Sequence, residues 1–443
     1  MPGVRRAVRI RGGVGAGVLS SGPRDPFRYQ GDRLHCESVS IEGLALEQGT
    51  PLYVYSRAAI EDRYRAFDSA FSPLDRLIAY SVKANGNLSV LRLLAELGAG
   101  ADIVSGGELH RALLAGIPAD RIVFSGVGKT RAEFVQALEA GVHAFNVESE
   151  GELHALAATA EAMGRRAPVA LRVNPDVEAE TPHRYTRTGH LATKFGVPAA
   201  DAIRLYREIA GHASLHARGI DVHIGSQIMD AVPFELAVRR VLEQVRQLRT
   251  EGIELEYVDV GGGFGIAYED EADPSAESFA RVLLPELAGS GLRVILEPGR
   301  FIVGPAGVLV TRVLYVKRMG AKTFVITDAG MNDLLRPSHY ASYHRVEPVV
   351  RRAERQSAVV DVVGPVCESG DFLALNRTIA MPEPGELLVL RTAGAYGFAM
   401  ASTYNSRPRP AEVLVDGGHV HLARRRETIE DLVHAELELL GAL

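Results

Sequence analysis

Cysteine is scarce in this sequence, and neither a long apolar run nor an excess of one charge is present. The 443 residues include two cysteines, Cys36 and Cys367, too far apart in the chain for a disulfide framework or a metal-ligand cluster. No apolar run reaches the roughly 18 residues that a membrane span needs. The 49 Lys and Arg against 55 Asp and Glu give a net charge of −6, which excludes a strongly basic nucleic-acid-binding protein. We therefore expect no membrane or nucleic-acid partner and a reducing, cytoplasmic compartment.

The N-terminal segment differs from the rest of the chain, whose composition is that of an ordinary globular protein. Five arginines precede the first acidic residue, Asp25, among Gly, Val and Ser. The apolar part, residues 12–19, is interrupted by glycine and is weak for a secretory signal, while organelle import stays open. Its glycines lack the preceding strand and following helix of a dinucleotide-binding loop. We expect residues 1–26 to form a disordered basic extension.

Short β-rich runs alternate with amphipathic helical stretches from residue 77 onward. Leucine and alanine recur at helical spacing in residues 87–97 and 149–163, which lie between such runs. The expected strands begin at eight positions: Leu77, Gly100, Ile122, Ala144, Val169, Gly219, Tyr257 and Val294. Eight β/α units favour an α/β fold with a (β/α)8 TIM-type barrel. The main alternative, an open doubly wound sheet, is disfavoured by this count and by the near-regular spacing of the first strands.

The pattern changes after residue 304. Val-rich runs, separated by Gly and Pro turns, occupy residues 308–317, 323–327, 358–363 and 386–391. We interpret them as a mainly antiparallel β domain, to which residues 27–40 are expected to add a strand. The expected division is therefore a barrel over residues 51–307 and a β domain formed by residues 27–50 and 308–443.

The active site of such a barrel lies at the C-terminal ends of its strands, and residues capable of chemistry collect there. Lys83 follows the first strand. A lone lysine at that place is more often a surface residue, but burial would lower its pKa and make it a nucleophile for a carbonyl cofactor. Polar residues stand at the ends of other strands: Ser105, Glu148, Arg172, His223, Glu297 and Arg300.

A glycine turn, residues 261–263, follows the seventh strand. Three glycines let backbone N–H groups approach a phosphate without interference from side chains. A tight turn without any ligand explains the glycines equally well when they are considered alone. The coincidence of this turn with a lysine, a histidine and a carboxylate at one barrel face favours a cofactor site.

Seven motifs together resemble one enzyme family, and no single motif carries the resemblance. They are YSVKAN (80–85), ADIVSGGEL (101–109), DVHIGSQ (221–227), VDVGGGFG (258–265), EPGR (297–300), GPVCESGD (364–371) and AYGFAMASTYNSRPRP (395–410). From residue 27 to the C-terminus, the chain is similar to the fold-type III pyridoxal-phosphate-dependent decarboxylases. Within them it resembles the diaminopimelate decarboxylase family.

The resemblance implies a pyridoxal 5′-phosphate cofactor. Lys83 resembles the Schiff-base lysine, His223 the catalytic imidazole that stacks on the cofactor ring, and Glu297 the carboxylate that pairs with the pyridine nitrogen. An anionic partner keeps that nitrogen protonated, so the ring is a stronger electron sink for decarboxylation. The other residues implied in cofactor binding are Asp102, Ser226, Gly262, Gly263, Gly299, Arg300 and Tyr396.

The resemblance also implies a homodimer whose active sites are shared between subunits. Cys367 resembles the acid that protonates the reacting carbon, delivered from the opposite subunit, and Glu368 the residue that binds the distal ammonium of the substrate. A buried structural thiol is the ordinary alternative, and we expect it for Cys36. The residues implied in binding the substrate's second carboxylate are Arg300, Arg336 and Tyr340, and Tyr396 is implied in contacts with both substrate and cofactor.

The activity implied is decarboxylation of meso-2,6-diaminopimelate to L-lysine and CO2, the last step of lysine biosynthesis. Two alternatives stay open: a decarboxylase of ornithine, arginine or carboxynorspermidine, and a catalytically dead regulator of the same fold. Histidine pairs at 339 and 344 and at 419 and 421 have spacings that a metal could use. No carboxylate or cysteine completes either set, so we expect no metal.

Overall fold

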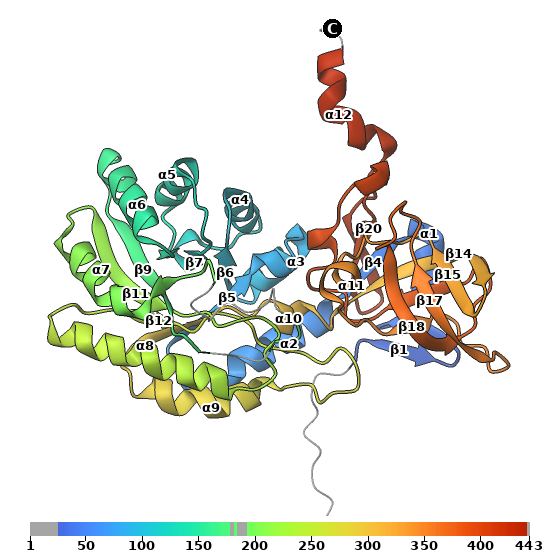
Figure 1. Ribbon diagram of the computed structural model, residues 1–443, viewed down its shortest axis with the longest axis horizontal. Coiled ribbons are helices and arrows are strands. Elements are labelled where there is room, and N and C mark those ends of the chain that lie inside the picture. The colour runs from blue at the N-terminus through green and yellow to red at the C-terminus, as the bar shows by residue number, and fades with distance from the viewer. Residues whose placement is uncertain (1–24, 178–180, 184–192, 441–443) are drawn as a thin grey trace, which may run out of the picture.

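The computed structural model describes residues 25–177, 181–183 and 193–440. It has two lobes, a barrel of parallel strands surrounded by helices and a second lobe of mainly antiparallel strands (Figure 1). The expected N-terminal extension lies outside the described residues apart from Asp25 and Pro26. None of the described helices combines the length and the apolar character that crossing a bilayer requires.

Eight parallel strands form a closed barrel. They are β5 (Arg76–Ser81), β6 (Gly100–Ile103), β7 (Ile122–Phe124), β8 (Ala144–Val147), β9 (Ala167–Asn174), β11 (Leu215–Asp221), β12 (Tyr257–Asp259) and β13 (Arg293–Leu296). The circle closes because β13 pairs with β5 and β8 pairs with β9, while the short β10 (Val197–Pro198) adds to β9. Each strand begins at or near its predicted start. The barrel is thus confirmed and the open sheet is excluded.

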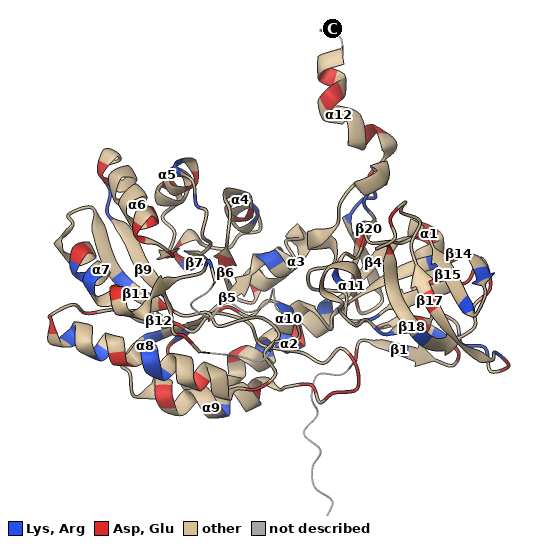
Figure 2. Cartoon of the chain, viewed as in Figure 1, with Lys and Arg blue, Asp and Glu red and all other residues tan. Residues whose placement is uncertain are grey.

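A helix follows each barrel strand on the outside. These helices are α3 (Leu88–Glu96), α4 (Gly106–Leu114), α5 (Arg131–Ala140), α6 (Glu150–Ala162), α7 (Ala199–Gly211), α8 (Val232–Thr250), α9 (Ala276–Ala288) and α10 (Arg300–Val303). Local sequence sets their ends, as in α5, where Thr130 and Glu133 form a capping box and Gly141 ends the helix in the left-handed region. Basic and acidic residues are interspersed along the outer helices α8 and α9 (Figure 2).

The barrel interior is apolar in its lower part and polar at the C-terminal ends of the strands. Residues two apart share a face of a strand, so each strand sends alternate residues inward. One buried cluster consists of Leu77, Ala79, Val123, Ala144, Ala170, Tyr257 and Ile295. Two residues beyond several of these stand buried polar side chains: Ser81, Asn146, Arg172, Asp259 and Glu297. This register places a layer of polar side chains beneath any ligand that binds at that end of the barrel.

The glycine turn after β12 is anchored by packing outside the barrel. Phe264 follows the turn and its ring lies 4.8–5.1 Å from the rings of Phe67, Phe234 and Phe279. These rings come from α2 (Arg57–Ala70), α8 and α9. Truncating such a buried phenylalanine typically costs about 3–5 kcal/mol, so this cluster gives the turn a rigid base.

The second lobe contains a nine-stranded sheet. Its strands are β4 (Leu52–Ser56), β14 (Gly307–Met319), β15 (Lys322–Thr327), β16 (Val346–Pro348), β17 (Ser357–Val363), β18 (Phe372–Ala380), β19 (Leu387–Leu390), β20 (Ala411–Asp416) and β21 (His419–Arg424). The pairs β15–β17 and β4–β20 are parallel and the others are antiparallel, as expected of a mainly antiparallel domain. The expected boundary at residue 51 assigned β4 to the barrel, but its hydrogen bonds to β14 and β20 place it in this sheet.

The first described strands form a small sheet of their own beside the nine-stranded sheet of the β domain. β1 (Phe27–Gln30), β2 (Arg33–Cys36) and β3 (Val39–Ser40) pair with one another, a single antiparallel bridge joins Arg33 to Val350, and α1 (Ile41–Gln48) follows them. The Leu34 N–H donates to the Val349 carbonyl at 2.8 Å, which ties this sheet to the β domain. Cys36 is fully buried in the core that they share, as expected of a structural thiol.

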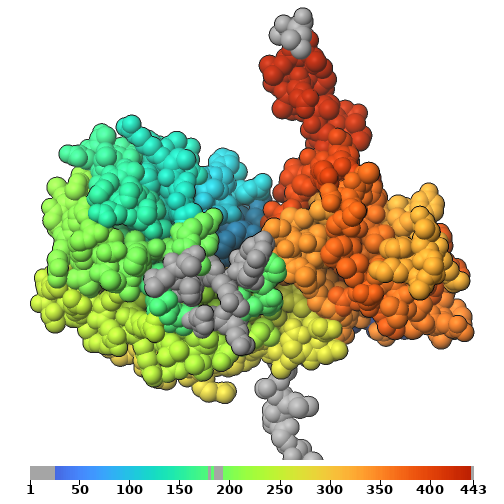
Figure 3. Space-filling model, viewed as in Figure 1, coloured from blue at the N-terminus to red at the C-terminus, as the bar shows by residue number. Residues whose placement is uncertain are grey.

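The last helix, α12 (Ile429–Leu440), projects from the body of the molecule (Figure 3). Its residues are mostly exposed, and its apolar side chains recur at spacings of three and four residues: Ile429, Val433, Leu437 and Leu440. A helix with an uncovered apolar stripe is typical of an interface.

Candidate active site

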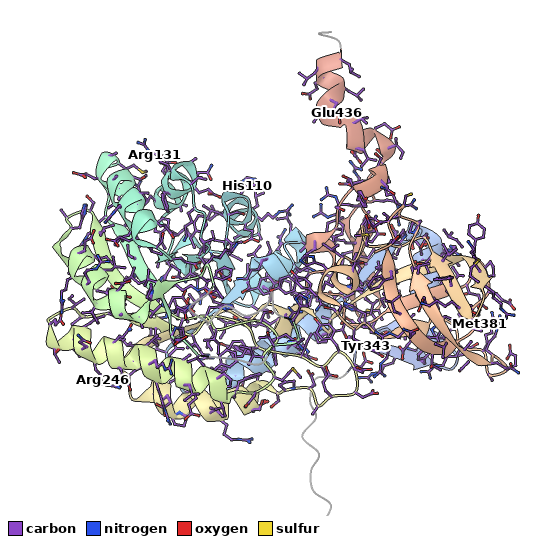
Figure 4. All side chains as sticks on the ribbon, viewed as in Figure 1. His110, Arg131, Arg246, Tyr343, Met381 and Glu436 are labelled. Carbon is purple, nitrogen blue, oxygen red and sulfur yellow. The ribbon has the colours of Figure 1, made fainter. Side chains whose placement is uncertain are left out.

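A cavity of about 580 Å³ opens at the C-terminal ends of the barrel strands. The predicted residues that line it are Lys83, His223, Ser226, Gly263, Glu297, Gly299, Arg300, Arg336, Tyr340 and Tyr396. Both lobes contribute walls, since α11 (Arg336–Tyr340) and Tyr396 follow β14 in the chain. Tyr343, another wall residue, is labelled on the β lobe in Figure 4. The structure thus brings together ten of the predicted residues around one space.

Lys83 lies in a one-turn helix directly after β5, and its ammonium contacts a buried carboxylate. The distance from Lys83 Nζ to Asp102 Oδ2 is 2.6 Å, and Asp102 also lies 2.8 Å from Ser81 Oγ. Burial lowers the pKa of Lys83, but the nearby acids Asp102 and Glu297 outweigh burial and raise that pKa above its ordinary value. The expectation of a lowered pKa was therefore wrong for the free amine, because it considered burial without the neighbouring charges.

The turn that carries Lys83 is held by the β domain. The Tyr396 N–H donates to the carbonyl of Ala84 at 2.8 Å. The side chain of Asn85 donates to the carbonyl of Gly394 at 3.1 Å. Tyr396 itself adopts a left-handed backbone with φ of 56°, which a tyrosine rarely does. The two residues that follow Lys83 are thus hydrogen-bonded to one loop of the β domain.

Three buried acids, Glu297, Asp221 and Asp259, cluster at the base of the cavity with Asp102 close by, and burial raises the pKa of all three. Burial raises the pKa of Glu297 and of Asp221 well above their ordinary values, and it raises the pKa of Asp259 to about 6. Neighbouring acids, Asp102 among them, add to each of these shifts. Glu297 Oε1 is buried and has no hydrogen-bond partner. A buried carboxylate oxygen aimed at a cavity without a partner is suited to a cationic or N–H-bearing ligand atom.

The imidazole of His223 is kept neutral. Burial, the nearby guanidinium of Arg172 and Lys83 together hold the pKa of His223 well below its ordinary value. Arg172 is itself buried and donates to Glu148 at 3.1 Å, which fixes it beneath the histidine's side of the cavity. A neutral flat ring can lie against an aromatic ligand without adding charge. Ser105, by contrast, caps α4 and has a structural role, since its Oγ accepts from the Glu108 N–H.

The predicted glycines permit close approaches between neighbouring loops. A Cβ on Gly262 would lie 2.4 Å from the Glu297 carbonyl oxygen, and one on Gly299 would lie 2.9 Å from the Ser81 Cβ. Gly263 has φ of 98°, which disfavours any other residue. The glycines are therefore required by the packing alone, and they also leave the cavity wall here without side chains.

Arg300 and Arg336 form a cationic wall. One terminal nitrogen of Arg300 donates to Ser226 Oγ at 3.0 Å and the other to the Tyr268 hydroxyl at 2.7 Å. Arg336 lies 2.9 Å from His344 Nε2. Within the described ranges, neither guanidinium forms an ion pair with a carboxylate. Two buried cations without counterions are suited to an anionic ligand.

Cys367 and Glu368 stand apart from this cavity. Both lie in the loop between β17 and β18, Cys367 is exposed, and neither lines the cavity. The Cys367 N–H donates to Asn405 Oδ1 at 2.8 Å, and the Tyr404 hydroxyl donates to Glu368 at 3.3 Å. The structure of one chain thus does not bring these two residues to Lys83.

Sequence reasoning missed several residues in and beneath the cavity. Asp221, which lines it, and the buried Asn146 and Asp259 could have been found from strand periodicity, because each stands two residues after an inward-facing residue at a strand end. Tyr268 had no such signal, since it lies in an irregular segment after the glycine turn. Of the predicted histidine pairs, His344 has its two ring nitrogens beside Arg336 and the Arg391 carbonyl.

The barrel, the lysine at the end of its first strand, and the unpartnered buried carboxylate opposite it define a pyridoxal-phosphate enzyme of the decarboxylase class. The family model described as "Pyridoxal-dependent decarboxylase, pyridoxal binding domain" matches residues 57–304. One relative and two solved structures assign the chain to a narrower family. Diaminopimelate decarboxylase of Neisseria meningitidis serogroup B is 49% identical over 409 residues, which cover 92% of this chain and 98% of that protein.

Two solved structures agree with that relative. A crystal structure from Aquifex aeolicus has a TM-score of 0.88 at 46% identity and covers 93% of this chain and 98% of that chain. Diaminopimelate decarboxylase of Helicobacter pylori, crystallised with L-lysine, has a TM-score of 0.86 at 42% identity and covers 90% of this chain and 99% of that chain. The chain belongs to the diaminopimelate decarboxylase family. The fold, the cofactor and the family inferred from the motifs are confirmed.

Proposed function

We propose that this chain decarboxylates meso-2,6-diaminopimelate to L-lysine and CO2, the last step of lysine biosynthesis. The observation that carries the proposal is the pair of buried guanidinium groups, Arg300 and Arg336, that share the cavity with Lys83. Diaminopimelate has a carboxylate at each end, so one must be held while the other is lost. The second carboxylate requires a cation at the far side of the cavity, and a guanidinium binds it with two parallel hydrogen bonds.

The residues of this chain that would hold pyridoxal phosphate have distinct tasks. Lys83 supplies the amine that attaches it, His223 presents a neutral face to its ring, and Glu297 offers an unpartnered oxygen to its ring nitrogen. Ser226, Gly263, Gly299 and Arg300 form the wall suited to its phosphate, and Gly262 lies buried directly behind it. When bound, the cofactor supplies a carbonyl for amines and a ring that accepts the electrons released with CO2.

The contacts of Lys83 suggest which group takes its proton, and two tyrosines line the cavity nearby. Lys83 must lose a proton to act as a nucleophile, and Asp102 Oδ2, at 2.6 Å, is the base within reach. Tyr396 lies under the Arg300 guanidinium, 4.7 Å from ring centre to charge, and closes the cavity on the side of the β domain. Tyr340 follows Arg336 by one helical turn and lines the same wall.

The proton for the carbon that loses CO2 would come from a second copy of the chain. We infer a homodimer in which the partner's Cys367 donates this proton and the partner's Glu368 binds the distal ammonium. The exposed position of that loop and the uncovered apolar stripe of α12 support this arrangement. In this proposal the barrel, beginning after β4, holds the cofactor, and the β domain completes the partner's site. Two unpaired thiols accord with a cytoplasmic location.

A substrate panel tests the activity. We expect meso-diaminopimelate to be decarboxylated with far higher kcat/KM than ornithine, arginine, lysine or carboxynorspermidine. In Arg336→Lys, the KM for meso-diaminopimelate should rise about tenfold or more, because lysine cannot form the paired hydrogen bonds. Absence of turnover on meso-diaminopimelate, or faster turnover of ornithine, would contradict the proposal. The alternative substrates are not favoured, since each of them has only the carboxylate that is lost and gives the two arginines no second carboxylate to bind.

A further inference from the structure

Tyr268 is the residue on which the two arginines converge, although no motif pointed to it. Its hydroxyl accepts a hydrogen bond from Arg300 at 2.7 Å. The Arg336 guanidinium carbon lies 4.6 Å from the centre of its ring, and the ring of His344 meets it edge-on at 5.5 Å. One side chain therefore contacts both halves of the cationic wall.

The contacts of Tyr268 reduce the electrostatic repulsion between the two arginines. Two buried guanidinium groups repel each other, and no carboxylate among the described residues neutralises either of them. Burial alone would raise the pKa of Tyr268, but Arg300 and Arg336 outweigh it and lower that pKa below its ordinary value. The phenol oxygen and the ring face of Tyr268 thus supply electron density to both arginines, whereas the Tyr396 ring lies against Arg300.

The contacts also fix where the guanidinium groups point. Arg300 is held at both terminal nitrogens, by Ser226 on one side and by Tyr268 on the other. Arg336 rests on the ring of Tyr268 while His344 Nε2 takes one of its N–H groups. His344 Nδ1 lies 2.9 Å from the Arg391 carbonyl, so it is the protonated ring nitrogen and Nε2 is free to accept. Without the phenol hydroxyl, one arm of Arg300 would lose its partner.

We propose that Tyr268 is a positioning residue that aligns Arg300 and Arg336 for the substrate carboxylate that is retained in the product. This inference rests on the proposed function, and it assigns to Tyr268 a role in selecting ligands that keep this carboxylate. L-lysine keeps the carboxylate, whereas cadaverine, the same chain without it, does not. The two compounds therefore separate carboxylate recognition from general damage to the cavity.

Tyr268→Phe tests the role, because it removes the hydroxyl and keeps the ring. The KM for meso-diaminopimelate should rise about tenfold or more, as expected from losing a hydrogen bond to a charged group. The kcat should change much less, and the visible absorbance of bound pyridoxal phosphate should stay unchanged. The inhibition constant of L-lysine should rise with the KM, while that of cadaverine should not. Tyr315→Phe, at an exposed position on β14, is the matched control and should match the wild type.

Two results with Tyr268→Phe alone would overturn the inference. One is an unchanged KM and unchanged L-lysine inhibition in Tyr268→Phe, and the other is equal weakening of L-lysine and cadaverine. A double variant with Arg336→Lys gives a second measure, since residues that act together lose less in combination than the product of their separate effects. Independent effects of the two changes would also contradict it. If the wild-type enzyme does not turn over meso-diaminopimelate, the proposed function is wrong. The effect of Tyr268→Phe on the affinity for L-lysine, compared with that for cadaverine, would still test the role of Tyr268.

Discussion

Mixing two inactive variants tests whether active sites are shared between subunits. Lys83→Ala removes the amine of its own cavity, and Cys367→Ala removes a thiol that lies outside the cavity of its own chain. In a two-fold dimer, each site would combine the Lys83 of one chain with the partner's Cys367. A mixed dimer then has one site with both wild-type residues and one site with neither. Random exchange makes half of the dimers mixed, so activity should return to about a quarter of the wild-type value.

The assay follows L-lysine formation after the two variants have been mixed under mild conditions that allow subunits to exchange. Each variant alone sets its own baseline. Lys83→Ala mixed with Glu297→Gln is the matched control, because both residues line the cavity of one chain and no mixed site contains both in wild-type form. Mixed dimers isolated with two different affinity tags should reach about half of the wild-type activity. Recovery no greater than the two baselines, in dimers shown to be mixed, would refute the shared site.

Three further predictions address single residues. Glu297→Gln should keep the visible absorbance of the bound cofactor and lower kcat by about 10- to 100-fold, which corresponds to the loss of one hydrogen bond to a charged group. A kcat within twofold of the wild-type value would contradict the role of Glu297. Burial raises the pKa of Asp333 from 3.8 to about 7, so its contribution to stability is lost as pH rises from about 4 to about 7. Asp333→Asn should therefore gain about 3 kcal/mol relative to wild type between pH 5 and pH 8, measured by urea unfolding, and equal pH profiles would contradict this. Gly262→Ala should abolish cofactor binding, because its Cβ would meet the Glu297 carbonyl oxygen at 2.4 Å, and normal absorbance in the purified variant would show that the turn can shift.

The barrel could be predicted from sequence because its signal is local. Strand residues of period two and helix residues of period near four alternate along residues 76–303, and each unit pairs with its neighbours in chain order. The position of β4 could not be predicted this way. It precedes the barrel in the chain but pairs with β14 and β20, which lie more than 250 and 350 residues later. Pairing over such distances leaves no trace in local periodicity.

The site was predictable where a motif stood at a strand end, and not where the contact arises from folded loops. Lys83, His223 and Glu297 follow strands, so the closed barrel brings them together. The ionisation of Lys83 depends on Asp102 and on other acids beneath it, and a single strand does not reveal such neighbours. Tyr268, in an irregular segment of the barrel, meets Arg336, the first residue of α11, only in the folded chain.

The hydrogen bonds that tie the Lys83 turn to the β domain have a consequence for how the enzyme fails on heating. Ala84 and Asn85 are bound to a loop whose Tyr396 holds a rare backbone conformation. Small openings between lobes need far less free energy than global unfolding, and they would free the lysine turn while the barrel stays intact. Loss of activity should therefore precede the main thermal transition. A barrel that stays intact but has lost these hydrogen bonds would hold Lys83 in the wrong position.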